Sequence, residues 1–124
     1  MTAAVLRVVV ADDSALYRKT ICNLLQQKVN LQVVAEAEDG LAAVRAVEKY
    51  RPDVVLMDIS MPGVDGIDAT SIIRSKFPQV RVIILSMHDG NSFAKAAYQA
   101  GAFWYLSKGC SPKEIIQALM TAGI

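Results

Sequence analysis

The chain has 124 residues, of which 53% are hydrophobic and 20% charged, so it can form one domain with its own core and is too apolar for a disordered segment. Its formal net charge of +1 gives no electrostatic reason to expect nucleic acid or an anionic membrane surface as a partner. The apolar stretches are too short to span a bilayer and no secretory leader is expected, so we predict a cytoplasmic protein with reduced thiols. One histidine and two cysteines, without a C-x-x-C spacing, make a zinc site unexpected.

Hydrophobic patterning predicts five strands that alternate with five helices. Strands are expected where short apolar runs rich in Val, Ile and Leu end at polar or turn residues, a pattern typical of parallel strands covered on both faces. These runs are residues 6–11, 31–37, 54–57, 80–85 and 103–106.

The helices are expected from apolar residues spaced three and four apart. Their expected inward-facing residues are Tyr17, Ile21, Leu24 and Leu25; Ala43, Val44 and Val47; Ala69, Ile72 and Ile73 on a helix over about 66–76; Phe93, Ala96, Ala97 and Ala100; and Ile115, Ile116, Leu119 and Met120. Because alanine buries little apolar area, the fourth helix is expected to be the least firmly anchored.

Polar residues mark where several helices begin. Asp39 is expected to cap the second helix, and Ser111 the last, in a capping box with Pro112 at the first helical position. Ser14 can cap the first. The alternation of elements predicts an α/β fold, a doubly wound five-stranded parallel sheet with helices on both faces. No linker or repeat divides the chain, so residues 1–124 are expected to form one domain.

Polar side chains follow four of the predicted strands at the point where each strand ends. In open parallel sheets ligands bind beyond the carboxyl ends of the strands, so these side chains are candidates for one site. They are Asp12 and Asp13 after the first strand, Asp58 after the third, Ser86 after the fourth, and Ser107 and Lys108 after the fifth.

Such a cluster favours phosphoryl chemistry. Close carboxylates repel one another unless a cation joins them, and Mg²⁺ prefers hard oxygen ligands together with a phosphate oxygen. A lysine ammonium and a serine hydroxyl can both hold a phosphoryl group. Asp58 would then be a nucleophile that forms an acyl phosphate, rather than a residue that only caps a turn.

The motifs VVADDS, VVLMDISMPGVDG, VIILSM and YLSKG, in this order and spacing, closely resemble the receiver domain of bacterial two-component response regulators. The resemblance covers essentially the whole chain, and MHDG and GAFWYLSKG look most like receivers of LuxR-type regulators, which carry a helix-turn-helix output domain. It implies the flavodoxin-like receiver fold with strand order 2-1-3-4-5.

The resemblance also implies a role for each site residue. Asp58 matches the phosphorylated aspartate, and Asp12 and Asp13 match the acidic pair that binds Mg²⁺, with Asp13 the direct ligand and Asp12 acting mainly through water. Ser60 would lend its backbone carbonyl to the metal.

Three further positions match residues that sense the phosphoryl group. Ser86 matches the hydroxyl residue that moves to bond it, Lys108 the lysine that pairs with it, and Tyr105 the aromatic switch. Many receivers have proline after the lysine, whereas Gly109 follows here, so we expect a trans Lys108–Gly109 bond.

The lifetime of the phosphorylated state is expected to depend on three residues around the approach of water. Met87 and His88 follow the switch serine, and Ser60 lies two residues past Asp58. The Met87 thioether is expected to exclude water and slow the loss of the phosphoryl group, whereas His88 could instead orient a water and speed it.

The resemblance implies a phosphorelay signalling domain and not an enzyme, although such a domain assists its own phosphorylation and dephosphorylation. A sensor histidine kinase would donate the phosphoryl group. The face from the fourth to the fifth helix would contact an output domain or partner protein, with possible dimer formation on phosphorylation and no direct contact to nucleic acid or membrane.

Two arrangements of the parent protein stay open. The chain is either the N-terminal domain of a DNA-binding transcription regulator, with an output domain that residues 1–124 do not include, or a free-standing receiver. An Mg²⁺-dependent aspartyl phosphatase is a weaker alternative, because Ser60 stands where the haloacid-dehalogenase family places a second acid.

Simpler interpretations exist for individual residues. Tyr105 could be packing, His88 a solvated loop residue, Trp104 either core or partner surface, and Cys22 and Cys110 structural or surface thiols.

Overall fold

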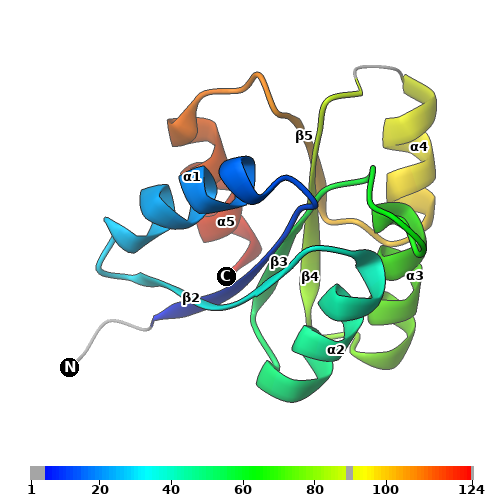
Figure 1. Ribbon diagram of the computed structural model, residues 1–124, viewed down its shortest axis with the longest axis horizontal. Helices are drawn as coiled ribbons and strands as arrows, with labels where there is room; N and C mark the ends of the chain where they lie inside the picture. The colour runs from blue at the N-terminus through cyan, green and yellow to red at the C-terminus, as the bar shows by residue number, and fades with distance from the viewer. Residues whose placement is uncertain (1–4, 89–90, 124) are drawn as a thin grey trace.

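The computed structural model describes residues 5–88 and 91–123 and shows one parallel sheet with strand order β2-β1-β3-β4-β5 (Figure 1). The elements in chain order are β1 (Leu6–Ala11), α1 (Ala15–Gln26), β2 (Leu31–Ala37), α2 (Gly40–Tyr50), β3 (Val54–Met57), α3 (Gly66–Lys76), β4 (Arg81–Ser86), α4 (Asn91–Gln99), β5 (Trp104–Ser107) and α5 (Pro112–Ala122). The predicted fold class and strand order are confirmed.

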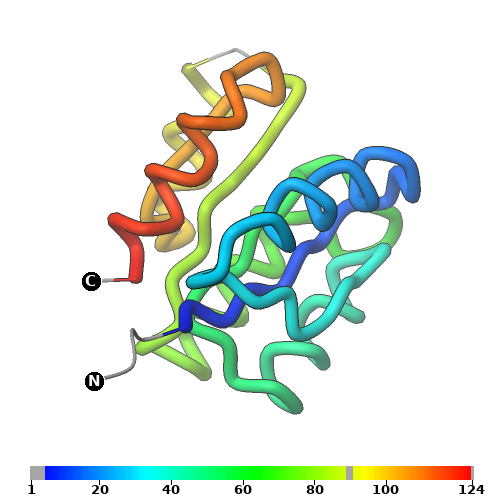
Figure 2. Tube along the Cα trace, turned by 90° about the vertical axis from the view of Figure 1, so that its left-hand side faces the viewer, coloured from blue at the N-terminus to red at the C-terminus, as the bar shows by residue number. Residues whose placement is uncertain are grey.

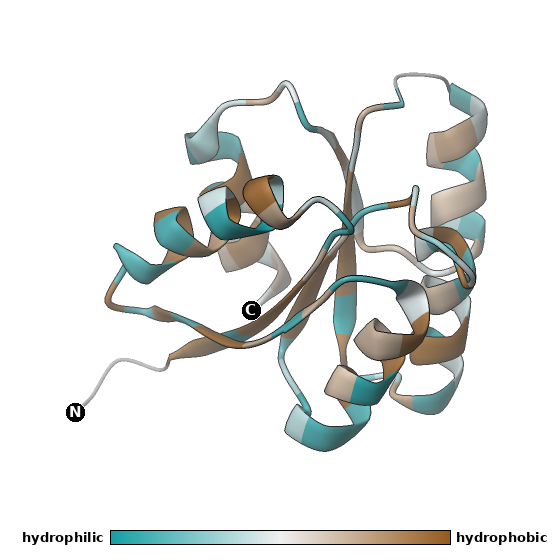
Figure 3. Ribbon diagram, in the orientation of Figure 1, coloured by the Kyte–Doolittle hydropathy of each residue, from teal (hydrophilic) through white to brown (hydrophobic). Residues whose placement is uncertain are grey.

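Helices cover both faces of the sheet (Figure 1). One buried cluster joins one face of the strands to α2, α3 and α4, and a second joins the other face to α1 and α5. Figure 2, viewed from the side of α1 and α5, shows these two helices in front of the sheet. In Figure 3 the strands are mostly hydrophobic, while hydrophilic residues lie on the outer sides of the helices. Successive residues of β1 and β3 pack into opposite clusters, which explains their continuous apolar runs.

The predicted bounds agree with the structure for β1, β2, β3 and α3 and differ for two strands. The fourth and fifth strands were expected at 80–85 and 103–106, and β4 and β5 each lie one residue further along the chain. The reason is pairing: Ser86 is the ladder partner of Ser107, so both polar residues belong to the sheet although neither continues an apolar run.

The predicted helix caps are present. The side chains of Ser14, Asp39 and Ser111 accept backbone N–H groups at the starts of α1, α2 and α5. Asp65, which the sequence analysis did not single out, caps α3 in the same way. Each cap satisfies a donor that the first helical turn leaves free.

The prediction of an inward-facing side chain is wrong for two residues. Phe93 in α4 is 36% exposed and Met120 in α5 is 38% exposed. The Phe93 ring stacks on His88 beyond the end of β4, and the Met120 sulfur accepts a hydrogen bond from the Asn30 side chain at the margin of the layer. Ala97 is the single buried residue among those described in α4, so the weak anchoring expected of this helix is confirmed.

None of the helices in the described part of the chain combines the length and hydrophobicity needed to cross a bilayer. Within the same part no cis peptide bond occurs, so Lys108–Gly109 is trans as expected.

Candidate acidic phosphoacceptor site

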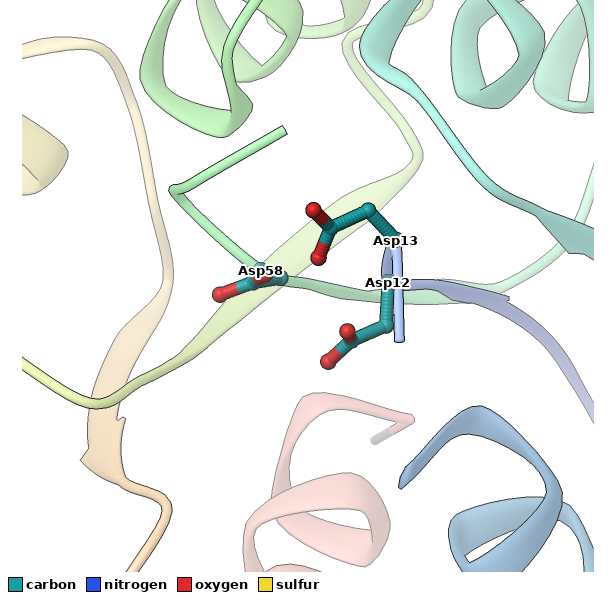
Figure 4. Close-up of side chains that lie close together, drawn as sticks. All are labelled: Asp12, Asp13 and Asp58. Atoms are coloured by element: carbon teal, nitrogen blue, oxygen red, sulfur yellow. The ribbon is translucent and has the colours of Figure 1, made fainter. Parts of the chain in front are cut away.

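Three aspartates meet at the carboxyl ends of β1 and β3 (Figure 4). Asp12, Asp13 and Asp58 each offer a carboxylate oxygen, and these oxygens lie within 4.8 Å of one another. Asp12 and Asp58 are buried, whereas Asp13 is exposed. The predicted acidic cluster is therefore formed, with a solvent-facing side at Asp13.

The sheet fixes the two buried carboxylates. The backbone N–H of Asp58 donates to the carbonyl of Ala11, and that of Asp12 donates to the carbonyl of Ala37, both at 2.9 Å. One carboxylate oxygen of Asp12 also accepts the N–H of Ser14 at 2.8 Å. Asp12 thus has two roles. One of its carboxylate oxygens stabilises the turn into α1, and its carboxylate also belongs to the acidic cluster.

Lys108 brings the compensating positive charge from the end of β5. Its Nζ lies 2.7 Å from Asp12 Oδ2 and 3.5 Å from Asp58 Oδ1, and its side chain is only 11% exposed. The ammonium is therefore closer to Asp12 than to the predicted phosphoacceptor. It bridges the two buried carboxylates.

Tyr17 belongs to this site and was missed by the sequence analysis, which assigned it to the core. Lys108 Nζ lies 4.3 Å from the centre of the Tyr17 ring, a distance that favours a cation–π contact. Burial, followed by the negative charges of Cys110, Asp12 and Asp58, raises the pKa of Tyr17 to about 12. Its place three residues after the Ser14 cap was the available signal, because such a side chain leans back over the strand end.

The surroundings of Asp58 disfavour its charged form despite the presence of Lys108. Burial raises the pKa of Asp58 above its ordinary value, Asp12 and Asp13 raise it further, and Lys108 lowers it. A hard divalent cation would relieve the repulsion among the carboxylates, and the donor set of carboxylate oxygens with one exposed member suits such an ion. The described residues therefore fit the expected metal chemistry.

The loop after Asp58 is held close by glycine. A Cβ on Gly66 would lie 1.8 Å from the Asp58 carbonyl oxygen, so no other residue fits there without a shift of the backbone. The Gly66 N–H donates to the carbonyl of Ile59 at 2.9 Å, where α3 begins. This close approach fixes the loop that carries Ser60, which lies exposed at the rim.

The two predicted switch residues both contact the backbone of His88. Ser86 is fully buried and its Oγ accepts the N–H of His88 at 3.0 Å. The hydroxyl of Tyr105 donates to the carbonyl of His88. The backbone of one residue thus joins the candidate hydroxyl and the candidate aromatic switch.

The side chain of His88 is also engaged. Its Nε2 lies 3.0 Å from Ser60 Oγ, and its ring stacks on Phe93 with centroids 4.2 Å apart and an interplanar angle of 16°. The simpler interpretation of His88 as a solvated loop residue is therefore wrong. Sequence reasoning had no local signal for these contacts, and the next two residues of the MHDG motif, Asp89 and Gly90, lie outside the described residues.

Two large apolar side chains are exposed near the switch residues. Met87 is 74% exposed and Trp104 is 50% exposed, so Trp104 is not core. Trp104 lines a groove of about 390 Å³ between β5 and α5, together with Phe103, Leu106 and Ala118. This groove leaves partner surface as the remaining interpretation of Trp104.

Comparisons with known proteins agree with this geometry. The family model described as the response regulator receiver domain matches residues 8–120. The transcriptional regulatory protein DegU of Brevibacillus brevis is 40% identical over 114 residues, which are 92% of this chain and 48% of DegU. The chain spans about half the length of the curated relatives that it matches.

Solved structures show the same fold at similar identity. The signal receiver domain of the putative response regulator NarL from Mycobacterium tuberculosis has a TM-score of 0.94 at 36% identity, covering 98% of both chains. A LuxR-family two-component response regulator from Aurantimonas sp. SI85-9A1 has a TM-score of 0.91 at 36% identity, covering 95% of this chain and 84% of that one. The expected likeness to receivers of LuxR-type regulators is confirmed. The chain belongs to the response regulator receiver domain family, the signalling module of two-component systems.

Proposed function

We propose that Asp58 accepts a phosphoryl group from a sensor histidine kinase and that the modified domain presents a changed protein-interaction surface. The observation that carries this proposal is the buried Asp58 carboxylate between Asp12, Asp13 and the Lys108 ammonium. Buried charges this close together contribute little to the stability of a core. They are well placed to bind and stabilise a phosphoryl group during its transfer.

In the proposed reaction an oxygen of Asp58 bonds to phosphorus as the phosphorus–nitrogen bond of a phosphohistidine breaks, and the departing imidazole takes a proton from solvent. Lys108 lies 3.5 Å from Asp58 Oδ1 and can pair with a phosphoryl oxygen. Asp12 holds Lys108 in place at 2.7 Å. The ordered backbone around Asp58 keeps the nucleophile aligned.

Asp13, Asp58 and the backbone carbonyl of Ser60 would hold Mg²⁺ directly, and Asp12 would act mainly through water. When bound, Mg²⁺ neutralises charge on the phosphoryl oxygens. This assignment is supported by the three carboxylate oxygens that lie within 4.8 Å of one another and by the one exposed aspartate, which leaves the metal accessible.

The response is proposed to run through Ser86 and Tyr105. The Ser86 hydroxyl would donate to a phosphoryl oxygen, and the Tyr105 ring would enter the space that Ser86 leaves. The face formed by α4, β5 and α5 would then change, and its groove beside Trp104 would contact an output domain or a second copy of the chain. Since the chain spans about half of its curated relatives, we further propose that it works as the N-terminal receiver of a DNA-binding transcription regulator.

The lifetime of the acyl phosphate is proposed to depend on Met87, His88 and Ser60. The hydrogen-bond distance between Ser60 and His88 supports their shared location at the rim of the site. Ser60 carries a neutral hydroxyl, so it cannot supply the acid that a phosphatase would need at this position. A signalling domain is therefore favoured over the aspartyl phosphatase alternative.

The experiment is phosphorylation by a small phosphodonor, followed by intact mass. The wild type with Mg²⁺ should gain one phosphoryl group, and Asp58→Asn or excess chelator should prevent the gain. Asp53→Asn is the matched control, because Asp53 lies at the opposite end of the same strand and should leave labelling intact. An adduct that persists in Asp58→Asn, or that forms equally well in chelator, contradicts the assignment.

A further inference from the structure

We propose that the His88 ring holds the start of α4 against the loop after β3 through its contacts with Ser60 and Phe93. These contacts, called the clasp below, would form only in the unphosphorylated domain. His88 would then be a positioning residue that opposes phosphorylation, and opening the clasp would tighten the binding of a phosphoryl group. The inference rests on the proposed function, because it concerns the regulation of the same site.

Four contacts converge on His88 among the described residues. Its N–H donates to Ser86 and its carbonyl accepts from Tyr105, so its backbone joins both switch residues. Its ring edge meets Ser60 at 3.0 Å and its ring face meets Phe93 at 4.2 Å between centroids. His88 therefore links the phosphoacceptor loop, the end of β4, β5 and α4.

The stack on Phe93 is a described contact that joins the first turn of α4 to the end of β4. Ala97 is the single buried residue described in this helix, and it lies one turn further along. Phe93 is 36% exposed, and its ring stacks on the ring of His88. A helix with so little buried area responds to the loss of one aromatic contact.

The Ser86 hydrogen bond makes the clasp sensitive to phosphorylation. The same Oγ that accepts the His88 N–H at 3.0 Å is proposed to donate to the phosphoryl group. When Ser86 moves toward that group, residue 88 loses its backbone partner. A shift of its backbone then displaces the ring from both Ser60 and Phe93.

A contact present in one state only biases the equilibrium between the two states. If the clasp stabilises the unphosphorylated arrangement, its removal raises the apparent affinity for a phosphoryl mimic by up to the same factor. An aromatic stack of this kind corresponds to a change of about three- to tenfold. A purely structural role would instead leave the affinity unchanged or weaken it.

The test is calorimetric titration of beryllofluoride with saturating Mg²⁺ into wild type, Phe93→Leu and Gln99→Ala. Phe93→Leu removes the stack at a residue that touches neither the acidic cluster nor Lys108 in any described contact. Gln99→Ala alters an exposed residue of the same helix and is the control. We expect binding about three- to tenfold tighter in Phe93→Leu and unchanged in Gln99→Ala.

A second arm uses Ser60→Ala alone and combined with Phe93→Leu. Because both residues act through one ring, the two effects on affinity should be less than additive. Amide exchange in α4 without the mimic should be faster in both single variants. Unchanged or weaker binding in Phe93→Leu, or fully additive effects, would overturn the clasp.

Failure of the clasp and failure of the proposed function give different results. If wild type does not bind beryllofluoride with Mg²⁺, or if Asp58→Asn binds it equally well, the proposed function is wrong and the clasp falls with it. If wild type binds in an Asp58-dependent way and Phe93→Leu is no tighter, the clasp alone is wrong.

Discussion

Helices α3 and α4 cover the same face of the sheet, yet they are held very differently (Figure 1). Helix α3 begins at the Asp65 cap and buries Gly66, Ala69, Thr70 and Ile73, whereas α4 buries Ala97. The first follows the loop of Asp58, the proposed phosphoacceptor, and the second follows the loop after Ser86, the proposed switch residue. The proposed phosphorylation thus takes place in a closely packed part of the domain, and the proposed response takes place in a loosely packed part that small free-energy changes can shift.

The largest expected effect is on stability and compares these two helices directly. Ile73→Ala should lower the free energy of unfolding by about 2–5 kcal/mol, because Ile73 is fully buried. Phe93→Ala should lower it by about 1 kcal/mol or less, because the ring is partly exposed and α4 is weakly packed. Urea unfolding followed by circular dichroism measures both. Equal losses would contradict the division into two parts.

A smaller effect on the free energy of unfolding comes from the buried charge of Asp58 in the closely packed part. Burial and the neighbouring aspartates raise the pKa of Asp58 above its ordinary value of 3.8. The folded domain therefore binds this proton more tightly than the unfolded chain, and the free energy of unfolding falls as pH rises through the raised pKa. In chelator at neutral pH, Asp58→Asn should be more stable than wild type by on the order of 1 kcal/mol.

The difference between these two proteins should vanish below the ordinary pKa of 3.8, where Asp58 is protonated in both the folded and unfolded chain. Mg²⁺ at neutral pH should reverse it, because the ion stabilises the wild-type carboxylate. Thermal unfolding across pH, with and without Mg²⁺, measures both changes. A wild type that stays more stable than Asp58→Asn in chelator would show that Lys108 already balances the cluster.

The packed part was also the part that sequence could predict. Strands β1 and β3 end where their apolar runs stop, just before Asp12 and Asp58. Helix α3 begins at Gly66, as predicted. Strand alternation and the order of motifs then placed the carboxylates and Lys108 on one rim. These features depend on local pattern and on the position of each residue along its strand.

The loosely packed part was predicted less well. The contact between Ser60 and His88 joins residues 28 apart, and the stack of His88 on Phe93 crosses a loop, so neither has a local signature. Phe93 fits a helical stripe by spacing but lies beyond the edge of the core. Tyr17 was assigned to packing for the same reason, because a stripe shows which side of a helix faces inward and not what it meets there.

The remaining expected effect is on the lifetime of the phosphorylated state and leaves the stability of the fold aside. Met87 is 74% exposed beside the switch serine, and we expect its thioether to hinder the approach of water to phosphorylated Asp58. Met87→Ala should therefore lose the phosphoryl group faster, by at most about tenfold, which corresponds to about 1.4 kcal/mol in the barrier. Phosphoryl loss after removal of the donor is the measurement.

His88→Ala is the matching control for Met87→Ala. If the imidazole orients a water, this substitution should slow the loss, the opposite direction to Met87→Ala. An unchanged or slower rate in Met87→Ala would rule out shielding by the thioether.

The most direct test of the division into a closely packed and a loosely packed part is amide hydrogen exchange, measured with and without beryllofluoride and Mg²⁺. We predict that the changes centre on α4, β5 and α5, while α3 and the strands β1 and β3 keep their protection apart from the residues that flank Asp58. The same experiment on Asp58→Asn should show no change in either part. Changes confined to the loops around Asp58, with α4 and β5 unaltered, would contradict the account.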